Sequence, residues 1–119
     1  MPVASLLAQV VATRTGLGGV VGQKRKYFSW RFVVDFAGAN LSSVGKDVKV
    51  EPVITASRGQ IEIPSARPLE AVRGYRVMFD LKPTDDSMAP VNLRLYLRAN
   101  GQPLTETWLY QWMPDRRTL

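Results

Sequence analysis

The stretch Val91-Asn92-Leu93-Arg94-Leu95-Tyr96-Leu97-Arg98-Ala99 decides the fold, because apolar and polar side chains alternate along its whole length. Successive side chains of an extended chain point to opposite faces, so this alternation predicts a strand with one buried face. The same period of two runs through residues 31–36 and 75–81. The mixed polar faces predict antiparallel strands that are open to water on one side.

Further strands are predicted over residues 8–13, 48–56, 60–63 and 104–112. Arg58-Gly59 is predicted to be a hairpin turn between two of them. Asn100-Gly101 is the strongest hairpin signal, because both residue types tolerate positive φ, although three more residues pass before the next run begins. Seven short strands predict an all-β fold, an immunoglobulin-like two-sheet β-sandwich of about seven strands. A small barrel is the alternative, and residues 41–47 predict one short turn at most.

The inner faces of these strands predict one core between the two sheets. One domain is predicted over residues 8–114, with residues 1–7 as an N-terminal tail and residues 115–119 as a C-terminal tail. The core is predicted to consist of the following side chains: Phe32, Val34, Phe36, Val77, Phe79, Leu93, Leu95 and Leu97.

The chemistry open to this chain is narrow, because none of its 119 residues is a cysteine or a histidine. Thiol nucleophiles, Ser-His triads and thiolate or imidazole metal sites are therefore excluded, and we predict no metal and no cofactor. Carboxylates, lysine, tyrosine and hydroxyls remain. A glycosidase needs two carboxylates roughly 5–10 Å apart, and no pair is compelled to converge. We expect cross-strand ion pairs instead. They would join Asp35, Asp80 and Glu106 to arginines such as Arg31, Arg76 and Arg94.

The net charge of +6 raises the question of an anionic partner. The densest basic cluster is only Lys24-Arg25-Lys26, and the other basic residues are spread along the strands, so we do not predict a nucleic-acid partner. No apolar run approaches about 18 residues, which argues against membrane insertion. Residues 1–11 are apolar but have no basic segment before them, so we do not interpret them as a signal peptide.

Glycines gather between the first two predicted strands, at Gly16, Gly18, Gly19 and Gly22. A dinucleotide-binding loop would need different glycine spacing and a following helix, and a phosphate-binding loop would need Gly-Lys-Ser or Gly-Lys-Thr at its end. Residues 15–26 are therefore predicted to be a long, flexible connection between strands.

The last predicted strand is the most informative, because Trp108, Tyr110 and Trp112 share one face. Aligned aromatic rings suit a sugar-binding platform, since their faces stack on the apolar surface of a pyranose. Aromatic rings equally suit a core or a domain interface, where they bury large areas. Leu109 is the only apolar side chain on the opposite face, which favours the core or interface interpretation.

Four segments, in this order along the chain, are distinctive when taken together. They are Ala12-Thr13-Arg14-Thr15-Gly16, Arg31-Phe32-Val33-Val34-Asp35-Phe36-Ala37-Gly38, Gly74-Tyr75-Arg76-Val77-Met78-Phe79-Asp80 and Glu106-Thr107-Trp108-Leu109-Tyr110-Gln111-Trp112. With these segments the chain resembles the C-terminal domain of the osmoregulated periplasmic glucan biosynthesis proteins G and D. The resemblance runs from about residue 8 to residue 114 and is closer to the D type, through Asp85-Asp86-Ser87 and Trp112-Met113-Pro114.

The resemblance implies an immunoglobulin-like sandwich from a periplasmic protein of a Gram-negative bacterium that acts on glucans with a β-1,2-linked glucose backbone. In the family, the substrate cleft and the catalytic carboxylates belong mainly to a larger N-terminal β-sandwich domain. We therefore expect a non-catalytic, monomeric accessory domain that packs on and orients that larger domain, with β-1,2-glucan as a further ligand. Residues 1–7 would form the junction.

Two alternatives stay open. One is an enzyme fragment in which Asp35 or Glu106 completes a glucan-cleaving or transferring site, and the other is a β domain that binds a polyanion or nucleic acid. We assign no catalytic residue. Residues 13–26 follow the junction closely, so we expect their basic side chains near it. The candidates for contact with glucan or with the larger domain are Arg14, Lys24, Arg25, Lys26, Trp108, Tyr110 and Trp112.

Overall fold

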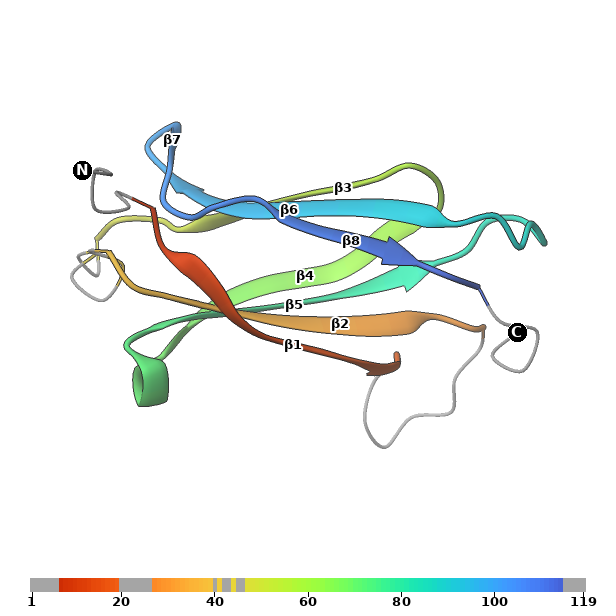
Figure 1. Cartoon of the computed structure of the whole chain (residues 1–119), viewed down its shortest axis with the longest axis horizontal. Coiled ribbons are helices and arrows are strands. Elements are labelled where there is room, and N and C mark those ends of the chain that lie inside the picture. Colours follow the sequence, from red (N-terminus) through yellow and green to blue (C-terminus); the bar gives the residue numbers. More distant parts are fainter. Residues whose placement is uncertain (1–6, 20–26, 40, 42–43, 45–46, 115–119) are drawn as a thin grey trace, which may run out of the picture.

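Two antiparallel sheets face each other in the computed structural model, which describes residues 7–19, 27–39, 41, 44 and 47–114 (Figure 1). The first sheet has the strand order β1-β2-β5-β4, and in the second sheet β6 pairs with β3, β7 and β8. The predicted all-β, immunoglobulin-like sandwich is thus confirmed. The strands are β1 (Gln9–Leu17), β2 (Trp30–Ala37), β3 (Glu51–Ala56), β4 (Gln60–Leu69), β5 (Gly74–Lys82), β6 (Val91–Ala99), β7 (Gln102–Pro103) and β8 (Trp108–Trp112).

The core lies between the sheets, where the sequence alternation places it. Each of the eight predicted core side chains is at most 1% exposed. Aromatic rings fill its centre: the rings of Phe32 and Phe79 stack with their centroids 5.2 Å apart, and the Trp108 ring meets both edge-on. A burial of this extent is the main stabilising contribution that the sequence pattern supplies.

The Asn100-Gly101 hairpin is confirmed and adds an eighth strand. Asn100 has φ 52° and Gly101 has φ 77°, and Ala99 pairs directly with Gln102. Two consecutive positive φ values are those of the tight turn that matches strand twist. The loop therefore has two residues, and the following strand β7 is only two residues long.

The predicted hairpin at Arg58-Gly59 is wrong. Strand β3 pairs with β6, whereas β4 pairs with β5, so the turn carries the chain from the second sheet to the first. A turn signal shows that the chain reverses, but two reversed strands can belong to different sheets of a sandwich.

Two strands are longer than the alternation predicted. Strand β1 continues past residue 13 to Leu17, and Gly16 lies in it opposite Arg31. Strand β4 continues past residue 63 to Leu69, across a register shift between Glu62 and Ser65. A bulge of this kind reverses the sequence alternation, so the pattern ends before the strand does.

Strand β1 crosses the full length of the sandwich (Figure 1). It begins at the end of the sandwich where β7 and the short 3-10 helix η2 (Glu70–Val72) lie (Figure 1). Just before it, the Ala8 backbone N–H donates to the Leu104 carbonyl at 2.9 Å, and just after it, Gly18 donates to the Ser29 carbonyl at 2.9 Å. The register confirms this direction, since Gln9 pairs with Ala37 at the end of β2 and Leu17 pairs with Trp30 at its start.

Candidate docking face

The outer face of the first sheet carries a concentration of charged side chains. We call Arg14, Asp35, Arg67 and Arg76 the Asp35 patch. The strand register brings them together: Asp35 of β2 lies opposite Arg76 of β5, and Arg76 lies opposite Arg67 of β4. Directly paired residues share one face of a sheet, so these three arginines and one carboxylate lie on the same face.

Asp35 is 4% exposed although it lies on the outer face. Arg76 donates two hydrogen bonds to it, from Nε to Oδ1 at 2.8 Å and from Nη2 to Oδ2 at 3.1 Å. Nη1 of Arg14 lies 3.7 Å from Oδ2 of the same carboxylate. The hydrogen bonds and the carboxylate charge raise the pKa of the Arg76 guanidinium above its ordinary value. The expected pairing of Asp35 with Arg76 is confirmed.

Arg67 was not singled out from the sequence. It is exposed, and its side chain makes no ion pair with any residue that the structure describes. The sequence pattern ended the strand at residue 63, and only the continuation of β4 past the bulge places Arg67 opposite Arg76. A prediction that the strand continues through residues 65–69 would have placed Arg67 on the sheet.

Asp80 forms a second buried ion pair on the same face. It is 2% exposed and accepts hydrogen bonds from Nε and Nη2 of Arg31, at 2.7 and 3.1 Å. It also accepts the backbone N–H of Gly19 at 3.0 Å, while Arg31 donates to the Gly19 carbonyl. A Cβ on Gly18 would lie 2.7 Å from Oδ2 of Asp80 and 2.4 Å from Oγ of Ser29. The pair therefore fixes the end of β1, and Gly18 allows the close approach.

An Asp80→Asn variant is expected to lower the free energy of unfolding by about 3 kcal/mol, because Arg31 then keeps a largely buried charge without its counter-ion. Thermal and urea unfolding measure the change. Asp85→Asn is the matched control, since Asp85 is half-exposed and lies 3.6 Å from Nε of Arg58, and it should cost less than about 1 kcal/mol. Equal losses in the two variants would contradict the importance of burial at Asp80.

Glu106 pairs with none of the arginines that the structure describes. Its Oε2 accepts the backbone N–H of Val10 at 2.8 Å, which ties the approach to β8 to the start of β1. The expected ion pair of Glu106 is therefore wrong, and the carboxylate serves the register of neighbouring segments.

The aromatic residues of β8 point into the core. Trp108 is 5% and Trp112 is 6% exposed, and Tyr110 is partly buried against the core. The Trp108 indole donates from Nε1 to Oγ1 of Thr13 at 3.1 Å, which joins β8 of the second sheet to β1 of the first. Rings this deeply buried leave no free face for a sugar to stack on, so the burial favours the core interpretation of Trp108 and Trp112.

The basic cluster Lys24, Arg25 and Lys26 lies outside the described residues. Residues 1–6 lie outside them as well, so the expected closeness of this cluster to the junction stays a prediction. Arg14 lies in the interior of β1, on the outer sheet face.

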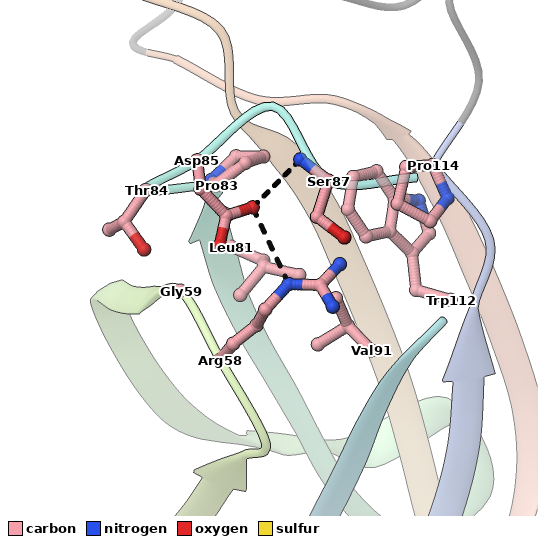
Figure 2. Close-up of a pocket in the computed structure, with 10 residues that line it drawn as sticks. All are labelled: Arg58, Gly59, Leu81, Pro83, Thr84, Asp85, Ser87, Val91, Trp112 and Pro114. Atoms are coloured by element: carbon pink, nitrogen blue, oxygen red, sulfur yellow. Dashed lines mark hydrogen bonds and ion pairs between the residues drawn. The ribbon is translucent and has the colours of Figure 1, made fainter. Parts of the chain in front are cut away.

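The described structure has a small pocket and a much wider groove. Under residues 83–90, a pocket of about 10 Å³ has room for roughly one water molecule. Figure 2 shows Asp85 over it, with its carboxylate near both Arg58 and the Ser87 backbone N–H. This contact anchors the loop to the β3–β4 turn.

A wider, open groove of about 810 Å³ lies between η2 and the segment that leads into β3. Aliphatic side chains such as Leu41, Val50 and Leu69 line much of it, and Glu70 is the one carboxylate among its described lining residues.

Within the described residues, no three His, Cys, Asp or Glu side chains gather into a group that could hold a metal ion. No helix found there has the length and hydropathy to span a bilayer.

The fold defines an immunoglobulin-like β-sandwich domain in which Asp35 and Asp80, the carboxylates of the central strands β2 and β5, are held in arginine pairs. The sequence model of the family described as "Periplasmic glucan biosynthesis protein, MdoG" matches residues 1–112, and the chain belongs to this family.

Close relatives carry the name "Glucans biosynthesis protein D". The chain is 66% identical over 116 residues to the protein of Xylella fastidiosa strain M12 and 64% identical over 115 residues to that of Xanthomonas axonopodis pv. citri. Each alignment covers 95% of this chain but 22% of the relative. The resemblance seen in the sequence is confirmed, and the chain spans about a fifth of the length of these relatives.

Proposed function

We propose that this chain is a non-catalytic, C-terminal accessory domain of a periplasmic protein that takes part in glucan biosynthesis. In this role it packs on a larger glucan-handling domain of the same protein and orients it. The observation that carries the proposal is the engagement of Asp35 and Asp80, the carboxylates of the central strands β2 and β5, in bidentate pairs with Arg76 and Arg31. A carboxylate held this way is positioned to stabilise a sheet rather than to exchange protons with a substrate.

The length of the relatives supports the accessory role. Nearly four fifths of each named relative lies outside the part that this chain matches. A substrate cleft and catalytic carboxylates on that remaining part would act on a β-1,2-linked glucan in the periplasm. The domain described here contributes a rigid sheet with charged outer side chains, a surface of the polar kind through which domains of one chain usually meet.

The test compares the 119-residue chain with a hybrid protein, in which this chain replaces the matched 116 residues of the Xylella fastidiosa relative. Both are incubated with linear β-1,2-glucan, and released sugar is measured. We expect no release by the chain alone. We expect a Glu106→Gln hybrid that remains folded to release sugar at the rate of the unmodified hybrid.

Sugar release by the chain alone, abolished by Glu106→Gln, would overturn the accessory role and favour the enzyme-fragment alternative. Loss of activity in a folded Glu106→Gln hybrid would do the same. Circular dichroism and thermal unfolding of each variant separate loss of chemistry from loss of fold.

A further inference from the structure

The outer face of the first sheet carries positive charge that the described residues do not neutralise. Asp35 is the only carboxylate in the Asp35 patch, and Arg76 already donates two hydrogen bonds to it. Arg14 reaches the same carboxylate only at 3.7 Å and is 67% exposed. Arg67 pairs with no carboxylate in the part of the chain that the structure describes. The Asp35 patch thus holds three positive groups and one negative group.

The position of Arg67 is costly in the chain on its own. Arg67 and Arg76 lie directly opposite each other on paired strands, and like charges in that relation destabilise a sheet. A surface that supplies carboxylates would remove the cost. Guanidinium groups favour this chemistry, because their planar fork binds a carboxylate through two parallel hydrogen bonds.

The neighbouring row of the sheet adds apolar area to the same face. Arg14 pairs with Val33, Val33 pairs with Met78, and Met78 pairs with Ser65. Val33 and Met78 are partly buried and lie between the arginines. A partly apolar centre with charged groups around it is the usual composition of a protein contact surface.

We propose that the Asp35 patch, with Val33 and Met78 beside it, docks an acidic surface on the remaining part of the longer protein. The proposal rests on the accessory function proposed above. It is argued from charge complementarity and from the four fifths of the relatives' length that lies outside this chain. Arg14 and Arg67 are the residues that recognise the partner's carboxylates, and Arg76 orients Asp35 between them.

The absence of cysteine from the sequence provides a direct test. Ser65→Cys places a single thiol on the proposed face, in the row of Met78 and next to Arg67. Asn92→Cys places one on the exposed outer face of the second sheet as the matched control. The rate of maleimide labelling at each thiol is measured by mass spectrometry, in the 119-residue chain and in the hybrid protein described above.

We expect Ser65→Cys to react at least about tenfold more slowly in the hybrid than in the chain alone, since a docked surface admits the reagent only when it opens. Asn92→Cys should react at the same rate in both. Adding Arg14→Glu and Arg67→Glu should restore fast labelling of Ser65→Cys in the hybrid, and raising the salt concentration to about 0.5 M should act in the same direction. Arg94→Glu, on the opposite sheet face, should leave the protection intact.

Four other labelling results would contradict the docking face, the accessory function or the role of the arginines. Slow labelling at Asn92→Cys together with fast labelling at Ser65→Cys would overturn this docking face but keep the accessory function. Fast labelling at both would count against the accessory packing itself. Protection of Ser65→Cys that survives the two charge reversals would overturn recognition through the arginines. Protection that appears in the chain alone only after heparin is added would favour the polyanion-binding alternative.

Discussion

A Gly74→Ala variant is expected to lose about 4 kcal/mol or more of unfolding free energy, one of the largest effects of a single methyl group in this protein. An added Cβ would lie 1.8 Å from the Phe36 carbonyl oxygen and 2.8 Å from the carbonyl carbon. Both atoms belong to the backbone of β2, which pairs with β5 beside the buried core. A side chain cannot rotate away to relieve this overlap, so the two central strands must separate there.

Gly16→Ala is the control, since no atom lies within 4 Å of the added Cβ and the residue also belongs to the first sheet. Its melting temperature should stay within a few degrees of the unmodified protein, whereas Gly74→Ala should melt roughly 10–20 °C lower. If the two variants melted together, the ends of β2 and β5 would be able to part without disturbing the core.

A Phe79→Ala variant is expected to lose about 3–5 kcal/mol, because it leaves a cavity at the centre of the sandwich. Phe79 is fully buried, stacks on Phe32 and receives the edge of Trp108. Its removal therefore loosens contacts in both sheets at once. Thermal and urea unfolding should show a large fall in stability with one cooperative transition.

Leu109→Ala is the control for Phe79→Ala. Leu109 is 68% exposed on the outer face of β8, so its removal should change the unfolding free energy by less than about 0.5 kcal/mol. An unchanged melting temperature for Phe79→Ala would contradict the placement of this ring in the inter-sheet core.

The period-two pattern predicted the inner faces of the strands correctly, because burial on one face is what selects alternating apolar residues. The side chains from Phe32 to Leu97 that it assigned to the core are all buried. It did not predict which strands pair. Residues on both sides of Arg58-Gly59 alternate in the same way whether the turn closes a hairpin or crosses between sheets.

The candidate site was predictable only in part, for a related reason. Asp35 and Asp80 were expected to pair with strand arginines, because both groups of residues lie on the polar faces of alternating strands. Arg67 was not predicted, because the bulge between Glu62 and Ser65 reverses the alternation of apolar and polar residues before β4 reaches it. The burial of Trp108 and Trp112 agrees with the core or interface interpretation, which the exposed Leu109 on the opposite face favoured.

The bulge in β4 also bears on how the molecule avoids joining its own copies. An edge strand with a continuous row of free N–H and C=O groups invites another chain to add to the sheet. In β4 that row is broken by the register shift after Glu62, by the positive φ of Ile63 and by Pro64, which has no N–H. The opposite edge strand, β1, is interrupted between Val10 and Ala12. Neither edge of the first sheet offers a long regular template, so we expect concentrated solutions to resist growth into sheet-extended aggregates.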